Sequence, residues 1–333
     1  MLDFSTGRTL KLLARTAPFV GMRVLVYIGI ALAYVVGIGI GAGIGGLFGK
    51  IGGATGTGAG WGGLIGFGLV SGMLFWARQY LLYLVKAAHI AVLVELLDGK
   101  SIPAGKGQIQ YGRELVQKRF AATSVLFGMH QLVRGILRVF HRVTVSITQF
   151  LPIPGLESVV KIFDAIVKTS LGSLDQVILA QIFKHGDASA WATSRDSVVL
   201  YAQSYKGILK NAVFLTFIVW GLTLALFLIV AIPLAALVAV VPALAGFWTF
   251  ALAAIVAFCL KAALIDPFTV TALLQVYAKE TQGKTPDPVW TERLEKMSNK
   301  FRELVQKARD AVQRPAPGQS AAQPPALLDT ASS

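Results

Sequence analysis

Long apolar stretches dominate the hydropathy pattern of this chain, and they come in two pairs. A helix needs about 20 apolar residues to cross the hydrocarbon core of a bilayer. Four stretches approach or exceed that length: 24–48, 59–77, 211–232 and 244–265. The third keeps its apolar character past Pro233 to residue 241. The pattern predicts an all-α, polytopic integral membrane protein with four transmembrane helices in two hairpins.

The composition supports this class of protein. Of the 333 residues, 55% are hydrophobic and only 14% are charged, whereas soluble domains carry about a quarter charged residues. The first apolar run is too long for a signal-peptide core and shows no small-residue cleavage site, so we expect the first span to be retained. The single cysteine, Cys259, excludes a disulfide framework and a cysteine metal site.

Lysine and arginine predict the orientation of the spans. Most of them lie in the segment 78–210, in the stretch after residue 278, or before the first span, as Arg8, Lys11, Arg15 and Arg23. Only Lys50 lies in a predicted outer turn. Because cytoplasmic loops are enriched in positive charge, both termini and the middle segment are expected in the cytoplasm, with the spans in the plasma (inner) membrane.

The net charge of +14 predicts contact with anionic lipids of the inner leaflet. Nucleic acid is the usual alternative partner of a basic chain. We do not expect it here, because the basic residues are spread along amphipathic helices without an aromatic-rich binding platform.

The most unusual stretch is the glycine-rich run 37–68, in which Gly41, Gly43 and Gly46 spell G-x-G-x-x-G. A dinucleotide site also needs a buried strand before the glycines and an acidic residue about 20 positions later. The run lies in a predicted membrane hairpin, and the chain has no Asp or Glu between Asp3 and Glu95. We therefore predict no cofactor site and assign helix packing to six glycines: Gly39, Gly41, Gly43, Gly45, Gly62 and Gly66. A moving gate or pore lining, with a hinge near 49–58, remains the alternative.

The spans divide the chain into segments. A basic N-terminus (1–23) precedes the Gly-rich hairpin (24–98), whose second helix is expected to run on to Asp98-Gly99. The segment 99–210 is predicted to form amphipathic cytoplasmic or interfacial helices. The second hairpin covers 211–278, and the tail 314–333 is rich in Pro, Ala and Ser and predicted to be disordered.

One helix of the middle segment carries a basic face opposite a bulky apolar face. Such a helix suits the membrane interface, although a helix packed on its neighbours with a solvated basic side gives the same pattern. The two histidines have no carboxylate at ligand spacing, so we predict no metal site. The candidate lipid-contacting residues are His130, Arg134, Arg138, His141 and Arg142.

Lys261 lies inside the fourth apolar run, and Asp266 follows five residues later. Charged side chains at membrane depth are candidates for function, although Lys261 can also snorkel and Asp266 can mark the end of the span. A spacing of five does not put the pair on one face of an ideal helix. Pro267 is expected to open the helix one turn earlier. Arg78, at the foot of the second span, is the proposed counter-charge of Asp266.

After the last span, Asp287-Pro288 has the signature of a helix start. Apolar residues then recur every three or four positions along 287–313. We predict an amphipathic C-terminal helix that docks on another helix, either of this chain or of a partner.

Residues 80–282 resemble the C-terminal half of the choline transporter-like family. The resemblance is carried by GKGQIQYGRELVQKRF (105–120), LDQVILAQIFKHGDASAWATSRDSVVLYAQSYKGILKNAVFLTFIVW (174–220) and LIDPFTVTALLQVYAKET (264–281). It implies transport of choline or a similar amphiphilic cation. The chain differs from that family in lacking its large cysteine-bearing extracellular loop and several of its spans.

The sequence bears on three classes of function. The sequence has no nucleophile elbow, phosphate loop, HExxH motif or clustered carboxylate pair, so we do not expect an enzyme. Membrane charges, a broken fourth helix and a glycine-rich hairpin favour a transporter or channel. The alternative is a non-catalytic scaffold or lipid-interacting subunit that homo-oligomerises or organises a partner at the inner leaflet.

Overall fold

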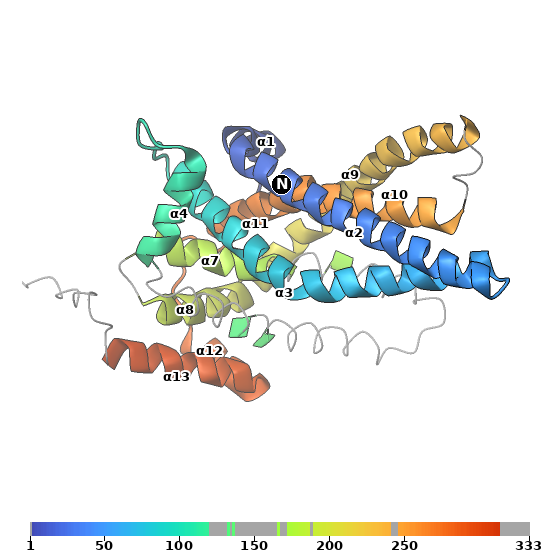
Figure 1. The fold of residues 1–333 in the computed structure, drawn as a ribbon. Helices are drawn as coiled ribbons and strands as arrows, with labels where there is room; N and C mark the ends of the chain where they lie inside the picture. The colour runs from blue at the N-terminus through green and yellow to red at the C-terminus, as the bar shows by residue number, and fades with distance from the viewer. Residues whose placement is uncertain are drawn as a thin grey trace, which may run out of the picture. The chain divides into compact units, whose positions relative to one another are not determined.

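The computed structural model describes residues 2–119, 132–133, 135–136, 165–166, 172–186, 189–240 and 246–313. These residues form helices and connecting turns, with no strand among them (Figure 1). The chain divides into two compact units. Unit 1 comprises Met1–Lys118 and Leu209–Lys279, and unit 2 comprises Arg119–Ile208 and Glu280–Ser333.

Unit 1 contains the helices of membrane-crossing length. Four stretches are long and apolar enough to span a membrane: Ala17–Ile51, Thr55–Phe75, Tyr205–Val240 and Ala253–Glu280. This confirms the predicted class of all-helical membrane protein. The helices of this unit are α1 (Thr6–Arg15), α2 (Ala17–Ile51), α3 (Thr55–Leu97), α4 (Gln108–Arg119), α9 (Tyr205–Val240), α10 (Phe247–Leu260), the π-helix η2 (Lys261–Ile265) and α11 (Asp266–Glu280).

The first membrane helix begins earlier than the hydropathy pattern indicates. Ser5 caps α1 by accepting a hydrogen bond from the backbone N–H of Arg8. Thr16 separates α1 from α2, and Pro18 stands in the first turn of α2, where a missing N–H is tolerated. Arg23, expected to precede the first span, is therefore an interior residue of α2.

Contact between glycine backbones holds α2 and α3 together as a hairpin. A β-carbon at Gly41 would overlap the carbonyl oxygen of Gly62, and one at Gly45 would overlap that of Gly58. A β-carbon at Gly66 would likewise overlap the carbonyl oxygen of Gly37, whereas one at Gly37 would first meet the side chain of Val70. We call these three glycine pairs the glycine seam. Helix backbones this close need glycine on both sides, as expected for helix packing in lipid.

Four of the six glycines assigned to helix packing lie at the contact between α2 and α3. Gly41, Gly45, Gly62 and Gly66 lie in the glycine seam, whereas a β-carbon at Gly39 or Gly43 would meet nothing within 4 Å. The seam repeats every fourth residue along α2, so positions offset by two point away from α3. Gly39 and Gly43 therefore lie outside the contact between α2 and α3.

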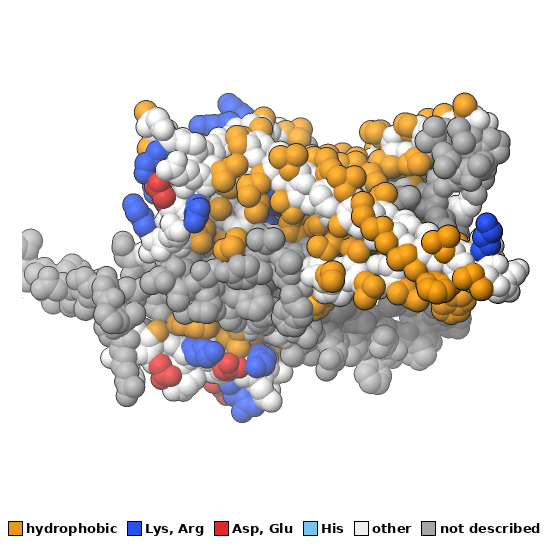
Figure 2. Space-filling model, in the orientation of Figure 1, with side chains coloured by type: hydrophobic (Ala, Val, Ile, Leu, Met, Phe, Trp, Pro, Cys, Tyr) orange, Lys and Arg blue, Asp and Glu red, His pale blue; other side chains and the backbone are white. Residues whose placement is uncertain are grey.

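The outer surface of the hairpin is apolar. Hydrophobic side chains cover the visible face of α2 and α3 in Figure 2. The largest exposed ones on α2 include Leu25, Leu47, Phe48 and Ile51. The chain reverses at Gly52–Ala54, where Gly53 adopts a positive φ of 71°, a conformation that glycine adopts at little cost. A surface of this kind suits hydrocarbon rather than water.

The second half of α3 supplies much of the core of unit 1. The helix ends at Leu97 with Asp98 as its cap and Gly99 at a φ of 80°, where the sequence predicts its end. Its side chains from Ala87 to Val94 are buried, with Ile90 and Val92 fully enclosed. Unlike the lipid-facing first half, this part of α3 is surrounded by protein.

Unit 2 is built around the predicted C-terminal stripe. Its helices are α7 (Leu174–Lys184), α8 (Ala190–Gln203), α12 (Pro288–Met297) and α13 (Asn299–Gln313). Phe301, Leu304 and Ala308 are fully buried on α13, which packs against α8. The stripe thus docks within this chain, and Lys307 also lies over the ring of Trp191 at 4.9 Å.

The single helix expected over 287–313 is in fact two helices. Asp287 caps α12 as predicted, accepting from Val289 N–H at 2.8 Å. Ser298 then adopts an extended conformation and its hydroxyl accepts from Phe301 N–H at 3.2 Å, so it starts a new helix. Serine is one of the residues preferred at the N-cap of a helix. The apolar periodicity continues across Ser298, so the sequence pattern does not show the break between α12 and α13.

Several predictions fall outside the described residues. These include the basic face (His130, Arg134, Arg138, His141 and Arg142) and the tail 314–333.

We predict that Gly41→Ala destabilises the protein while Gly43→Ala does not. The added methyl at Gly41 must separate the two backbones, an overpacking cost of about 1–3 kcal/mol. At Gly43 it meets open space and reduces the freedom of the unfolded chain. Thermal unfolding in one detergent gives the comparison, and equal melting temperatures for the two variants would contradict the glycine seam.

Candidate functional site

The fourth membrane-crossing stretch changes pitch near its middle. Between α10 and α11, the residues Lys261–Ile265 form the π-helix η2, and the backbone N–H of Asp266 bonds to the carbonyl of Lys261. Pro267 follows directly and cannot donate a backbone hydrogen bond. Single π-turns inside α-helices often occur at functional sites, and this one lies where the sequence predicts an opened helix.

The π-turn brings the two candidate charges together. Lys261 Nζ lies 2.8 Å from Asp266 Oδ1, and the two side chains are 31% and 36% exposed. A π-helix bonds residue i to residue i+5, so a spacing of five becomes one turn. The spacing rule for an ideal α-helix, which places Lys261 and Asp266 on different faces, therefore does not apply to this segment. The pair forms a salt bridge within an otherwise apolar segment.

The proposed partner Arg78 lies in α3, but its side chain is outside the described residues. Pairing of Arg78 with Asp266 therefore stays a prediction.

A second charged residue, Arg23, is buried more deeply than either member of the pair. Its side chain is 2% exposed, and its Nε and Nη1 atoms have no hydrogen-bond partner among the described residues. Asp266 and Tyr27 both act on it electrostatically. From the sequence Arg23 looks like a flanking charge. The spacing of Arg23 could have indicated its burial. It lies four residues from both Phe19 and Tyr27, and all three side chains are on the buried face of α2.

His89 on α3 is fully buried close to Arg23. Its ring stacks on Phe19 with centroids 5.1 Å apart, and its Nε2 lies 3.0 Å from Thr16 Oγ1. Thr16 Oγ1 also lies 3.0 Å from Leu12 O, and when its proton is donated there the oxygen accepts from His89 Nε2–H. Nδ1 then carries a lone pair, and it is buried without a hydrogen-bond partner among the described residues. Burial, and then the charge of Arg23, lowers the pKa of His89 well below its usual value.

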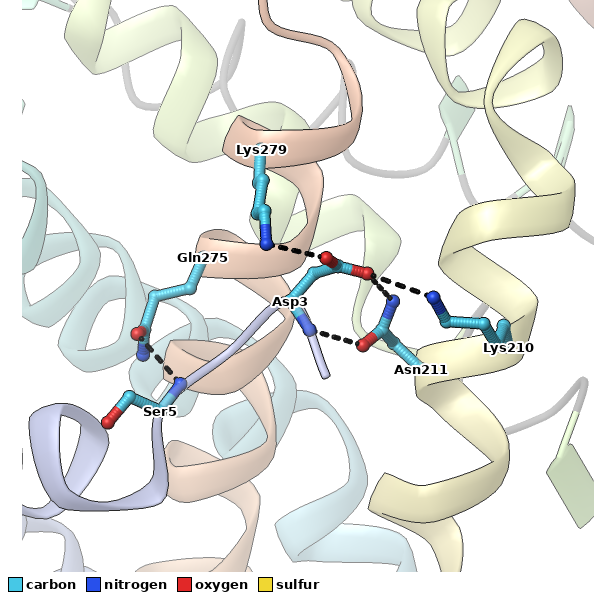
Figure 3. A network of polar contacts seen from close by, with 6 residues as sticks. All are labelled: Asp3, Ser5, Lys210, Asn211, Gln275 and Lys279. Carbon is cyan, nitrogen blue, oxygen red and sulfur yellow. Dashed lines mark hydrogen bonds and ion pairs between the residues drawn. The ribbon is translucent and has the colours of Figure 1, made fainter. Parts of the chain in front are cut away.

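A polar network ties the N-terminal segment to two membrane helices (Figure 3). Asp3 accepts from Asn211 Nδ2 at 2.6 Å and pairs with Lys279 at 2.8 Å and Lys210 at 3.6 Å. Its backbone N–H donates to Asn211 Oδ1 at 2.8 Å. Ser5 N–H approaches Gln275 at 3.4 Å. We call this network the Asp3 clamp. It joins the start of α9 to the end of α11.

The Asp3 carboxylate is held in its charged form. The hydrogen bond from Lys279, then that from Asn211, lowers its pKa below the usual range, and burial opposes this only in part. The side chain is 11% exposed. One feature of the sequence is consistent with this role, since Asp3 is the sole acidic residue before Glu95.

Among the described residues, no three His, Cys, Asp or Glu side chains gather in a way that could hold a metal ion. Comparisons with protein-family models, with curated proteins and with solved structures found no match for this chain.

We predict that Asp3→Asn lowers the melting temperature through loss of its charged hydrogen bonds, each worth about 1.5–3 kcal/mol. A lowered pKa in the folded state means that the clamp stabilises fully above the pKa of an unfolded Asp, about 3.9. Its contribution is lost as the pH falls through the lower folded pKa. The difference between wild type and variant should be constant from about pH 8 to 5 and shrink below about pH 4.

The exposed Asp310→Asn is the control for that comparison. A pH-independent difference down to the lowest pH at which the protein folds would contradict the role of the Asp3 charge.

We predict that Lys261 and Asp266 are energetically coupled. In a double-mutant cycle, Lys261→Met and Asp266→Asn should each lower stability, and the double variant should lose less than their sum by about 0.5–3 kcal/mol. The readout is unfolding in detergent. A parallel cycle with Arg78→Met tests the pairing predicted from the sequence. Strict additivity in the Lys261 cycle would show that the 2.8 Å contact does not contribute.

Proposed function

We propose that this chain is an integral membrane transporter or channel-like protein for a small charged solute. The observation that carries the proposal is the Lys261–Asp266 pair at the π-turn of a membrane-length helix. A charged residue at the centre of a span costs about 2.5–3.5 kcal/mol. Such residues therefore mark ion or substrate paths more often than structural positions.

The resemblance of residues 80–282 to the choline transporter-like family makes choline, or another small amphiphilic cation, the first substrate to test. The geometry suggests how it would bind. A cation that reaches the partly exposed carboxylate of Asp266 replaces the ammonium of Lys261 there, so the carboxylate keeps a counter-charge throughout.

The proposed orientation has both termini and the segment 78–210 in the cytoplasm, at a plasma (inner) membrane with anionic lipids. The Asp3 clamp then lies at the cytoplasmic ends of α9 and α11. Any motion that separates these two ends has to break the contacts of Asp3 with Lys279 and Asn211.

The second candidate is a lipid-interacting scaffold that homo-oligomerises. It is favoured by the glycine seam, whose backbone contact leaves no path between α2 and α3, and by the apolar outer surface of the same hairpin. In this role the outward face of the hairpin contacts lipid or a second copy. A large assembly in nanodiscs would favour the scaffold, whereas a monomer or dimer would favour transport.

We predict saturable uptake of labelled choline by proteoliposomes holding the wild-type protein, faster with an inside-negative potential. Asp266→Asn should reduce uptake about tenfold or more, because it removes the only negative charge of the pair. Asp310→Asn, an exposed change in unit 2, should leave uptake unchanged. Folding of each variant is checked by its melting temperature.

The absence of uptake by folded wild-type protein would exclude choline as the substrate. Uptake that survives in Asp266→Asn would exclude the π-turn pair as its site. Either result together with a large assembly would move the assignment to the scaffold.

A further inference from the structure

Among the described residues of unit 1, Arg23 is a buried cation whose side chain lacks hydrogen-bond partners. Arg23 is 2% exposed, with Nε and Nη1 both enclosed and unbonded among the described residues. A guanidinium cannot escape this situation by losing its proton. Removing such a charge from water without a partner is costly. A group that accepts these two hydrogen bonds would relieve that cost.

The charges around Arg23 indicate the sign of the missing group. Asp266 is the acidic residue that acts on Arg23, but its Oδ1 is held by Lys261 at 2.8 Å. Two cations thus share one carboxylate. His89 adds no charge, because burial lowers the pKa of its ring and keeps the ring neutral. The local charge is therefore positive, and the missing group is an anion.

His89 adds a second requirement. Its Nδ1 is buried and unbonded among the described residues, and it carries a lone pair in the tautomer whose Nε2–H donates to Thr16. A group that satisfies both residues accepts from Arg23 and donates a hydroxyl proton to His89. Inorganic phosphate at neutral pH has both kinds of oxygen. A lipid phosphate with a hydroxyl-bearing headgroup, as in phosphatidylglycerol, has them too.

We propose that Arg23, with His89 beside it, binds a phosphate group, either that of an anionic lipid headgroup or free phosphate. Arginine is well suited to this ligand, because its N–H donors form short, charge-assisted bonds to phosphate oxygens. The site lies on buried side chains of α2 and α3, not on exposed basic residues of the chain. It does not depend on transport, since an anion here serves a transporter or a scaffold equally.

The test uses the full-length protein in detergent after removal of bound lipid. One arm measures its melting temperature against inorganic phosphate, with chloride at equal ionic strength as the reference. The other arm compares nanodiscs of phosphatidylcholine with nanodiscs containing phosphatidylglycerol. Both arms use wild type, Arg23→Met, and Arg15→Met as the control at an exposed arginine.

We expect phosphate or phosphatidylglycerol to raise the melting temperature of wild type and of Arg15→Met. Arg23→Met should lose this shift, with binding weakened about tenfold or more. Without either ligand, Arg23→Met should melt higher than wild type, because an apolar side chain replaces an uncompensated charge. A response to phosphate alone identifies the free ion, and a response to phosphatidylglycerol alone identifies the lipid.

Two results would overturn the proposal. In the first, neither probe stabilises the folded wild type. In the second, Arg23→Met melts lower than wild type yet keeps the full ligand shift, which would mean that Arg23 is paired within the fold. If Arg23→Met does not fold, Arg23→Lys replaces it. That variant keeps the charge but loses the planar donor set, so it should bind more weakly than wild type, and unchanged binding would overturn the proposal.

Discussion

Backbone contact between α2 and α3 is the constraint on which the arrangement of unit 1 depends. In lipid, apolar side chains gain nothing by leaving hydrocarbon for one another, so helices associate through close packing and polar contacts. The glycine pairs of the seam provide that packing. Because the glycine seam fixes one face of α2 against α3, it also sets where the other faces of α2 point. One face is free to contact lipid. Another face places Tyr27, Ile30 and Ala31 in a buried cluster with Cys259 and Ala263.

The charged residues follow from the same arrangement. Arg23 shares the inward face of α2 with Tyr27, while His89 points inward from α3. Across from them, the π-turn allows Lys261 and Asp266 to pair in spite of their spacing. An apolar helix tolerates such residues only when geometry supplies partners. The salt bridge meets this condition, whereas Arg23 meets it only with a group from outside the described structure.

Sequence alone predicts the features that depend on local chemistry. Span length identifies the four membrane helices, and Gly99 and the Asp287-Pro288 pair mark helix ends correctly. Prediction from the sequence was wrong where tertiary contacts determine the structure. The apolar periodicity continues through Ser298, so it does not show that one helix ends there and another begins. The G-x-x-x-G spacing occurs on several helix faces, so it selected Gly39 and Gly43 together with glycines of the seam. Ideal-helix geometry separated Lys261 from Asp266, since a π-turn leaves no sequence signature apart from the following proline.

The Asp3 clamp also constrains the order in which the protein is built. The hairpin of α2 and α3 needs only a three-residue turn, Gly52–Ala54, so it can close as soon as it leaves the ribosome. The partners of Asp3 are Lys210, Asn211 and Lys279, more than 200 positions later. The first hairpin is therefore in the bilayer before its partner helices exist. Its inward face, which later packs against them, stays uncovered while residues 119–208, between the two parts of unit 1, are synthesised. Such a protein is most vulnerable to misassembly during translation, and its first residues are among the last to reach their final contacts.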